Sequence, residues 1–502
     1  MVSPVVLDGR SLKVADVVAV ARDGAAVSID SGARTRLVAA RQVVERAVAR
    51  GTTIYGVNTG FGKLAHVRIP PDDVRRLQRN LIISHAAGVG EPLPVDVVRA
   101  LMLLRANVLL METSGVRPDV PERVVAMLNA RVHPVVPEQG SVGASGDLAP
   151  LAHVALSLIG EGEVLDPATP GNRRPALAAL RQSGIEPIEF HAKEGIAFIN
   201  GTQAQTAILA LLVHDARNLW RAAHAAAATS LEALRGTPDP FDEALHRVRP
   251  HPGQRASAAL LRELLAESEI RESHRDGDPR VQDAYSLRCV PQILGPVWDV
   301  IEFAGGSLDI ELNSATDNPL VIGDAIVSGG NFHGQVVAHA LDFLAIALTT
   351  LAGVAERRIE RLVNPDLSQG LPPFLTAHAG VESGYMMVQI TAASLVAECR
   401  ALATPASVQS IPTDANQEDF VPMGMAAAFK GRRILTNARR VVAAELLCSV
   451  QGLEFLKPLR PGRGVEVVQR WVRALVPPLE HDRVITPDLE RLAHALETES
   501  IV

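Results

Sequence analysis

The sequence is poor in cysteine, and its three cysteines, Cys289, Cys399 and Cys448, lie far apart. A small, odd number argues against a disulfide framework and is typical of a reducing compartment. The N-terminal residues have no basic stretch followed by an apolar core, so they do not resemble a secretory signal. The weakly polar run FLAIALTTLAGVA, residues 343–355, is too short to span a bilayer as a helix. We therefore expect a cytoplasmic protein without a membrane partner.

Lysine is also scarce: the five lysines are Lys13, Lys63, Lys193, Lys430 and Lys457. None lies in a setting typical of pyridoxal phosphate, which needs a Schiff-base lysine. No spacing of histidine, cysteine or carboxylate residues is typical of a metal site. The net charge of −7 and the isoelectric point near 6.1 give no reason to expect a nucleic-acid partner. We expect neither a metal nor an external cofactor.

Helical periodicity is abundant in the 502 residues, of which 47% are hydrophobic and 21% charged. Apolar residues repeat at steps of three and four, as in Val97, Leu101 and Leu104, which predicts helices. Two of the predicted helices are apolar over most of their circumference, so they belong inside a bundle or an interface. The four strongest helical segments are residues 94–115, 202–234, 333–362 and 432–456.

Alternating patterns are few, and the best candidate strands are EGEVLD at 161–166 and EPIEFH at 186–191. The sequence predicts a mainly α protein with a long central helical bundle. We expect an N-terminal region over 1–195, the long-helix bundle over 196–456 and a C-terminal helical region over 457–502.

The stretch GSVGASGDLAP, residues 140–150, contains three glycines at a spacing of three, which disfavours a helix. It lacks the spacing of a phosphate-binding loop. If the backbone bends tightly, the amide nitrogen of Gly146 can approach the carbonyl carbon of Ala144, because Gly146 has no side chain. Cyclisation, together with dehydration of Ser145, would convert these three residues into a methylidene-imidazolone electrophile.

These residues resemble the motif of the aromatic amino-acid ammonia-lyases and aminomutases, which carry 4-methylidene-imidazol-5-one (MIO). Further segments resemble the family in the same order: YGVNTGFG (55–62), NLIISHAAGVGEPL (80–93), KEGIAFINGTQ (193–203), VQDAYSLRCVPQ (281–292), DNPLV (317–321), GGNFHG (329–334) and SIPTDANQEDFVPMG (410–424). The resemblance implies MIO formed from Ala144-Ser145-Gly146, a fumarase/aspartase-like helical superfold, and a homotetramer with shared active sites. The Gly-Ser-Ser-x-Met-Pro-x-Lys loop of fumarase and aspartase themselves is absent.

The resemblance also assigns roles to single residues. It implies that Tyr55 is the favoured general base and that Glu418 is a second candidate. The remaining roles are MIO formation for Asp147, catalysis for Tyr285, and substrate binding for Asn200, Gln282, Arg288 and Phe332. A bidentate guanidinium suits Arg288 to the substrate carboxylate.

The aromatic ring of the substrate is predicted from His85 and Glu418. Ser84-His85 resembles the family members that act on histidine, and the two side chains could bond the two imidazole nitrogens. We therefore expect elimination of ammonia from L-histidine to give trans-urocanate. Phe420-Val421-Pro422 replaces the usual His-Val-Ser of those members. A lyase or a 2,3-aminomutase acting on tyrosine or phenylalanine thus stays open.

Overall fold

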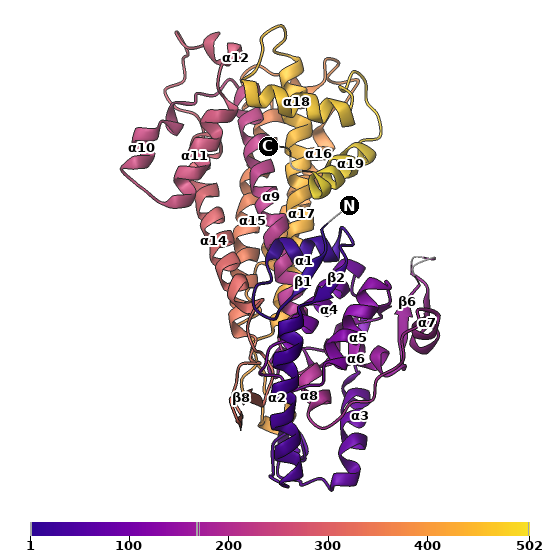
Figure 1. Cartoon of the computed structure of the whole chain (residues 1–502). Helices are drawn as coiled ribbons and strands as arrows, with labels where there is room; N and C mark the ends of the chain where they lie inside the picture. The colour runs from indigo at the N-terminus through magenta and orange to yellow at the C-terminus, as the bar shows by residue number, and fades with distance from the viewer. Residues whose placement is uncertain (1–2, 167–168, 170, 500, 502) are drawn as a thin grey trace. The chain divides into compact units, whose positions relative to one another are not determined.

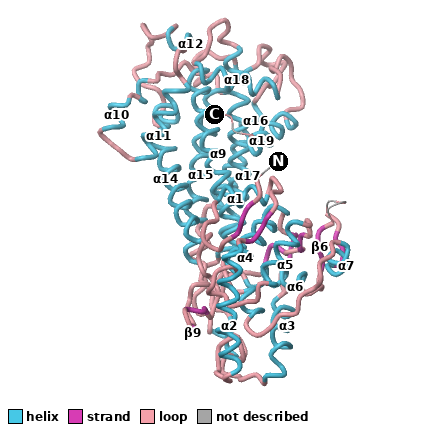
Figure 2. Tube along the Cα trace, in the orientation of Figure 1, coloured by secondary structure: helices cyan, strands magenta, loops and turns pink. Residues whose placement is uncertain are grey.

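The computed structural model describes residues 3–166, 169, 171–499 and 501, and helices dominate it (Figures 1 and 2). The described α-helices are α1 (Val14–Ala21), α2 (Ser31–Ala49), α3 (Val74–His85), α4 (Val95–Leu109), α5 (Asp119–Asn129), α6 (Leu148–Leu158), α7 (Ala176–Gln182), α8 (Glu194–Ile199), α9 (Gln203–Ala233), α10 (Glu243–Arg247), α11 (Pro252–Leu264), α12 (Glu269–Glu272), α13 (Tyr285–Arg288), α14 (Val290–Glu311), α15 (Gln335–Val363), α16 (Met386–Leu402), α17 (Gly424–Glu454), α18 (Arg463–Leu475) and α19 (Thr486–Thr498). The mainly α fold class predicted from the sequence is confirmed.

The four strongest helical predictions correspond to α4, α9, α15 and α17. Helix α4 follows Pro94, and every residue from Val97 to Leu109 is buried. Nearly all of α9 is buried around its whole circumference, as the apolar composition of its segment predicts.

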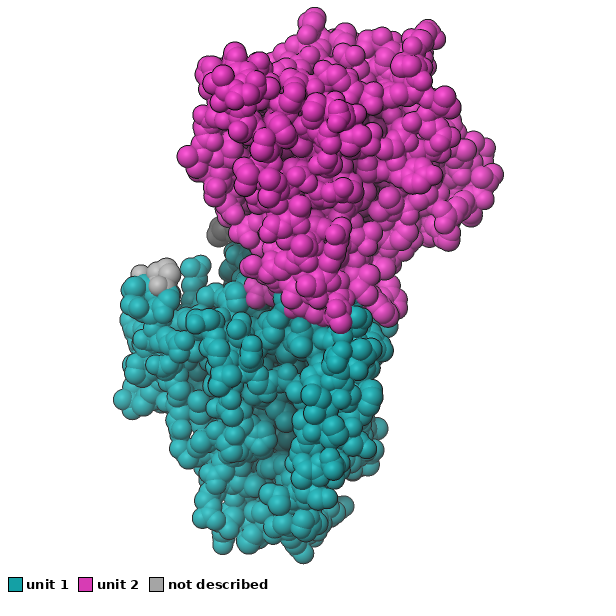
Figure 3. Space-filling view, turned by 180° about the vertical axis from the view of Figure 1, so that it is seen from behind, with its two compact units in different colours: residues 1–214, 305–342, 405–429 teal, residues 215–304, 343–404, 430–502 magenta. Residues whose placement is uncertain are grey.

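Two compact units make up the described chain (Figure 3). Unit 1 contains Met1–His214, Gly305–Asp342 and Pro405–Phe429, and unit 2 contains Asp215–Ala304, Phe343–Thr404 and Lys430–Val502. Each unit is therefore assembled from segments that are distant in the sequence. The three regions expected from the sequence, with boundaries at 195 and 456, stay a prediction.

Strands are short and form four small sheets in the described residues. They are β1 (Val5–Leu7), β2 (Val27–Ile29), β3 (Val89–Pro92), β4 (His133–Pro134), β5 (Pro137–Gln139), β6 (Glu163–Leu165), β7 (Arg173–Pro175), β8 (Leu320–Ile322) and β9 (Ala325–Val327). Strands β1 and β2 are parallel, whereas β3–β5, β4–β6–β7 and β8–β9 are antiparallel.

The strand predicted within 161–166 is confirmed as β6, and the strand predicted at 186–191 is wrong. Ile188 and Phe190 are buried and Glu189 is exposed, so the predicted alternation is present. A strand also needs a hydrogen-bonded neighbour. The segment makes only one described bond of this kind, from the Ile188 amide to the Leu158 carbonyl (2.9 Å). Alternation here reflects an extended segment that is half buried but belongs to none of the described sheets.

Three helices and one strand pair position the Gly-rich stretch in unit 1. Helices α3, α6 and α8 pack against one another. Pairing of β3 with β5 delivers the chain to Gly140, and α6 begins at Leu148, directly after Asp147. The Gly-rich stretch therefore lies between two anchored elements.

Helix α15 contains the weakly polar run at 343–355. At 29 residues it is long and apolar enough to cross a membrane by length and composition, and 61% of its most apolar window is buried inside the structure. Such burial is typical of a core helix, and it agrees with the interior position that the sequence predicts for this segment.

Candidate active site

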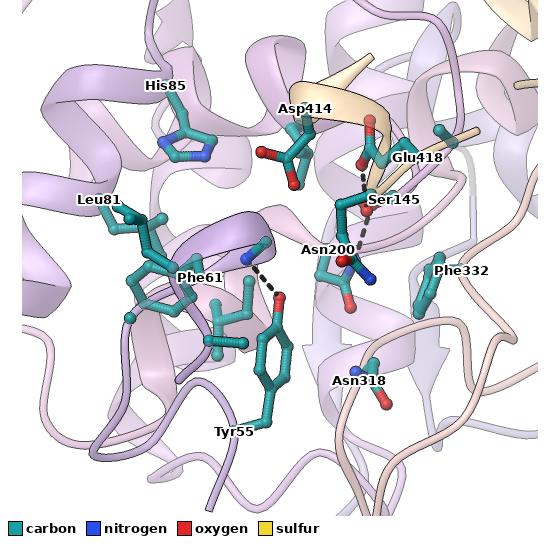
Figure 4. Close-up of a pocket in the computed structure, with 18 of the residues that line it drawn as sticks. Tyr55, Phe61, Leu81, His85, Ser145, Asn200, Asn318, Phe332, Asp414 and Glu418 are labelled. Carbon is teal, nitrogen blue, oxygen red and sulfur yellow. Dashed lines mark hydrogen bonds between the residues drawn. The ribbon is translucent and has the colours of Figure 1, made fainter. Parts of the chain in front are cut away.

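A cavity of about 980 Å³ in unit 1 gathers side chains from segments that are far apart in the sequence (Figure 4). The predicted site residues that line it are Tyr55, His85, Ala144, Ser145, Asn200, Phe332 and Glu418. Figure 4 shows Ser145 between Glu418 and Asn200, with Phe332 beside them. The structure thus brings together most of the residues that the sequence singled out.

The backbone of the Gly-rich stretch is tightly enclosed at Gly146. This residue has a φ of +75°, and a Cβ placed on it would lie 2.3 Å from the carbonyl oxygen of Gly201. The Asp147 amide donates to that same oxygen (2.7 Å). Only glycine can occupy position 146, because both the backbone conformation and the neighbouring chain exclude a side chain.

Asn200 follows α8 and contacts the Gly-rich stretch directly. Its Nδ2 donates to the Ser145 carbonyl oxygen (2.7 Å). Its Oδ1 is buried without a hydrogen-bond partner in the described structure. A buried acceptor without a partner is costly, so this oxygen is available to a donor group.

Glu418 is held by two hydroxyl groups on opposite sides. Ser145 Oγ donates to Glu418 Oε1 (2.5 Å), and Thr413 Oγ1 donates to Oε2 (2.6 Å). Both carboxylate oxygens are therefore oriented, one of them directly at the side chain of the central serine.

Asp147 is completely buried behind the Gly-rich stretch. It accepts hydrogen bonds from Ser141 Oγ (2.8 Å) and from the Gln205 amide (2.9 Å). Burial raises the pKa of Asp147 to about 6, against the opposing effect of these hydrogen bonds. Asp147 does not line the cavity, and its hydrogen bonds from Ser141 and Gln205 help to hold the loop in place.

Tyr55 lies in the loop after α2, and its hydroxyl accepts a hydrogen bond from the Gly62 amide (3.1 Å). The ring of Phe61 meets the Tyr55 ring edge-on at a centroid distance of 6.4 Å. Burial raises the pKa of Tyr55, and the charges of Asp414 and Glu418 raise it further. Without a substrate, the Tyr55 phenol therefore lacks the lowered pKa that would favour it as a general base.

His85 is the last residue of α3, and its Nδ1 lies 3.1 Å from the hydroxyl of Ser84. Burial lowers the pKa of His85, although Asp414 and Glu418 oppose the shift. His85 is consequently neutral at neutral pH and presents one ring nitrogen as donor and one as acceptor. In Figure 4 the His85 ring lies across the cavity from Asn200.

Gln282, Tyr285 and Arg288 do not line this cavity. They belong to unit 2, where Tyr285 and Arg288 are the first and last residues of α13. Tyr285 is 73% exposed, and the Arg288 guanidinium carbon lies 5.9 Å from the centre of its ring. The three residues are close to one another along the chain but are absent from the described lining of the Ser145 cavity.

Asp414 lines the cavity and was not singled out from the sequence. Its Oδ2 accepts a hydrogen bond from the Lys63 amide (3.1 Å). In Figure 4 it lies between His85 and Glu418. It lies in SIPTDANQEDFVPMG (410–424), the segment that also contains Glu418, but the sequence assigned Asp414 no role of its own. The described lining contains three carboxylates, Asp414, Glu418 and Asp419, and neither lysine nor arginine.

Known proteins with a similar sequence cover nearly the whole chain. The chain is 49% identical over 500 residues to histidine ammonia-lyase of Myxococcus xanthus, and the match covers 99% of this chain and 97% of that protein. It is 52% identical over 493 residues to histidine ammonia-lyase of Gloeobacter violaceus, covering 98% and 95%.

Two solved structures have the same fold over 99% of this chain. One is histidine ammonia-lyase from Trypanosoma cruzi, with a TM-score of 0.92, 44% identity and 94% of that chain covered. The other is tyrosine aminomutase from Streptomyces globisporus, with a TM-score of 0.94, 39% identity and 97% of that chain covered. A family model described as aromatic amino acid lyase matches residues 12–474. The chain therefore belongs to the aromatic amino acid lyase family.

Proposed function

We propose that this chain is a carbon–nitrogen lyase that eliminates ammonia from L-histidine and releases trans-urocanate. The observation that carries the proposal is the meeting of Ser145, Asn200, His85 and Glu418 in one cavity. The similarity to histidine ammonia-lyases at about half of all positions supports the same substrate.

The residues around the Gly-rich stretch fit an MIO group. Gly146 is confined by Gly201, and the amide of Asn200 already bonds the Ser145 carbonyl oxygen (2.7 Å). The unpartnered Oδ1 of Asn200 leaves an acceptor for a donor at the same place. An MIO group formed from Ala144, Ser145 and Gly146 would supply an electrophile for the amine or the ring of the substrate.

His85 and Glu418 recognise the imidazole ring in this proposal. Neutral His85 can accept or donate one hydrogen bond, and the Glu418 carboxylate can accept another. A phenyl ring has no group to bond either side chain. Formation of MIO would remove the Ser145 hydroxyl from Glu418 Oε1, and leaving that partly buried oxygen without a new partner is costly. The pair therefore favours imidazole over phenyl. Phe332 lines the same cavity and is proposed to contact the substrate.

Tyr55 receives the proton from the β-carbon in this proposal. Its pKa is raised in the free chain, so the phenolate is a minor form at neutral pH. A substrate ammonium close to the phenol would lower that pKa, since an opposite charge favours the ionised form.

The pH dependence tests the role of Tyr55. Because its pKa is raised above the ordinary value of 10.0, the phenolate fraction keeps increasing with pH throughout the alkaline range. We expect kcat/KM for L-histidine to rise with pH over the range in which the free substrate keeps its ammonium proton, and Tyr55→Phe to abolish the rise along with most activity. A pH profile of each protein checks this. A flat profile in the parent, with the activity lost in Glu418→Gln, would assign the proton acceptor to Glu418.

The substrate carboxylate needs a cation that the described lining of the cavity does not supply. We propose that Arg288 supplies it in the cavity of another subunit of a homotetramer, together with Gln282 and Tyr285. The exposure of Tyr285 in the single chain supports this arrangement.

Arg288→Lys should reduce kcat/KM about tenfold or more, because a bidentate charge-assisted contact is worth about 1.5–3 kcal/mol and lysine cannot form the fork. Steady-state kinetics on L-histidine measure the effect. Arg271, which lies in the same unit and pairs with Asp239, offers a control: Arg271→Lys should retain the parent kinetics. If Arg288→Lys retained the parent kcat/KM, as Arg271→Lys should, Arg288 would have a structural role.

Subunit complementation tests whether sites are shared. Ser145→Ala and Arg288→Ala proteins should each be nearly inactive, and co-expressed chains should regain part of the activity, because some sites then receive both intact residues. Absence of recovery in verified mixed oligomers would place both residues in the same subunit's site.

A substrate panel with product identification by mass spectrometry tests the whole proposal. L-histidine should be the preferred amino acid and should yield trans-urocanate and ammonia. A faster reaction with tyrosine or phenylalanine, or a β-amino acid product, would overturn the histidine assignment and favour a lyase or a 2,3-aminomutase for another aromatic amino acid.

A further inference from the structure

Arg105 is a completely buried cation one turn before the end of α4, and its guanidinium donates to the turn that carries Asn200. Nη1 donates to the Asn200 carbonyl oxygen (3.0 Å) and to Gln203 Oε1 (2.7 Å), and Nη2 donates to the Ala197 carbonyl oxygen (2.8 Å). Two of these acceptors are main-chain carbonyls at the end of α8, where a cation is also favoured by the helix dipole. The guanidinium therefore joins the end of α8 to the start of α9.

The same turn presses on the backbone of the Gly-rich stretch. Gly201 follows Asn200 directly, and its main-chain atoms occupy the space where Gly146 would otherwise have a side chain. A Cβ on Gly201 would itself lie 2.7 Å from Arg105 Nη1, so the guanidinium lies close to this glycine as well. Gly201 thus lies close both to the Arg105 guanidinium and to the backbone of Gly146.

The charge of Arg105 persists in this surrounding. Burial lowers its pKa to about 10, and the nearby charge of Asp317 opposes that shift. Asp317 itself is engaged by Lys193 Nζ (3.0 Å), which is also completely buried. The guanidinium is therefore protonated at neutral pH and is bonded to neutral oxygens, so its function is to hold those oxygens.

We propose that Arg105 is a positioning residue for self-modification of the chain: it holds the Asn200–Gly201 turn against Gly146, so that the Gly146 amide is kept near the Ala144 carbonyl. The inference rests on the proposed function, because it requires that an MIO group forms.

Two waters leave in that modification, and no oxidant is needed. The Gly146 nitrogen forms a bond to the Ala144 carbonyl carbon. The Ala144 oxygen departs as water with the protons of the Gly146 and Ser145 amides, which leaves a C=N bond. The Ser145 hydroxyl departs with its Cα hydrogen as the second water, which leaves a C=C bond. The first of these steps depends on how closely two backbone groups are held, and Arg105 acts on that step.

Arg99 provides a matched control on the same helix. It is also buried, and it donates to the carbonyl oxygens of Val20 (2.8 Å) and Leu128 (3.1 Å) and contacts His133 (3.0 Å), none of which touches the Gly-rich stretch. Replacing either arginine by methionine removes a buried cation that binds two main-chain carbonyls. Both changes should lower thermal stability, and only one of them should affect the modification.

The experiment measures the intact mass of the folded protein by mass spectrometry at successive times after synthesis. The parent and Arg99→Met should lose two waters at similar rates, whereas Arg105→Met should do so about tenfold or more slowly, as expected for loss of charge-assisted hydrogen bonds. Arg105→Lys, which keeps the charge without the fork, should fall between them. Gln203→Met removes one acceptor of the guanidinium and keeps the arginine. If the Arg105 variants do not fold, the intact mass of Gln203→Met is measured instead, and its loss of two waters should also be slower than in the parent.

The outcomes separate the two proposals. Folded Arg105 variants or Gln203→Met that lose two waters as fast as the parent would overturn the role of Arg105 and leave the proposed function intact. Equal slowing in Arg99→Met would show that instability alone is responsible, and it would overturn that role as well. A parent that is active with its full unmodified mass would instead overturn the proposed function.

Discussion

Ser145→Ala should produce a folded protein with almost no activity. The Ser145 side chain makes one described hydrogen bond, to Glu418 (2.5 Å), so its removal should cost only about 0.5–3 kcal/mol of stability. The contacts that hold the loop, from Asn200 to the Ser145 carbonyl and from the Asp147 amide to Gly201, do not involve the hydroxyl. Activity should nevertheless fall roughly a thousandfold or more, the order lost when the reacting group of an enzyme is removed.

Intact mass distinguishes this loss from misfolding. The parent should lack two waters, and Ser145→Ala can lose at most one, because alanine has no hydroxyl to eliminate. Ser157→Ala on α6 removes a buried hydroxyl of unit 1 that is remote from residues 144–146 in the sequence, and it should keep both the modification and the activity. An active parent with an unmodified mass would refute the self-modification at Ser145.

Exchange of the two ring-recognising groups should change the preferred substrate. His85→Phe combined with Glu418→Gln removes one polar partner of an imidazole and the negative charge of the other, and it offers a phenyl ring an apolar neighbour. We expect kcat/KM for L-histidine to fall by roughly a hundredfold or more, since each bond to a charged or polar group costs about 0.5–3 kcal/mol. The ratio of phenylalanine to histidine turnover should rise.

Kinetics with both amino acids test the exchange, and the single variants show whether the two effects add. His66→Phe is the matched control, because His66 is an exposed histidine that does not line the cavity. Parent-like preference in the double variant would mean that other residues choose the ring, with Phe420 the first to examine because it also lines the cavity.

The sequence predicted those parts of the structure that depend on neighbours along the chain. The spacing of Val97, Leu101 and Leu104 is a local property of a helix, and α4 follows it closely. The strand expected at 186–191 failed because alternation reports burial, whereas a strand also requires a partner that the local sequence does not encode.

The site divides in the same way. Ser145, Asn200 and Glu418 could be found because each lies in a distinctive motif, and the structure brings them together. Asp414 lies in the same motif as Glu418, but its position in the cavity and its bond from the Lys63 amide do not follow from that motif. Arg105 could not be found, because its importance comes from a contact with the Asn200 carbonyl, which is distant in the sequence. The same limit applies to the raised pKa of Tyr55, which results from burial and from two carboxylates in another segment.

Because of the close approach of Gly201 to Gly146, the covalent modification would also record that the chain has folded around this loop. These two residues are distant in the sequence, and their main chains meet only after both segments have reached their native positions. Covalent water loss at residues 144–146 would then be an irreversible mark of that event, and it would survive later denaturation. In a preparation that contains both folded and unfolded chains, the intact mass of each unfolded chain would show whether its residues around the loop had once reached their native positions.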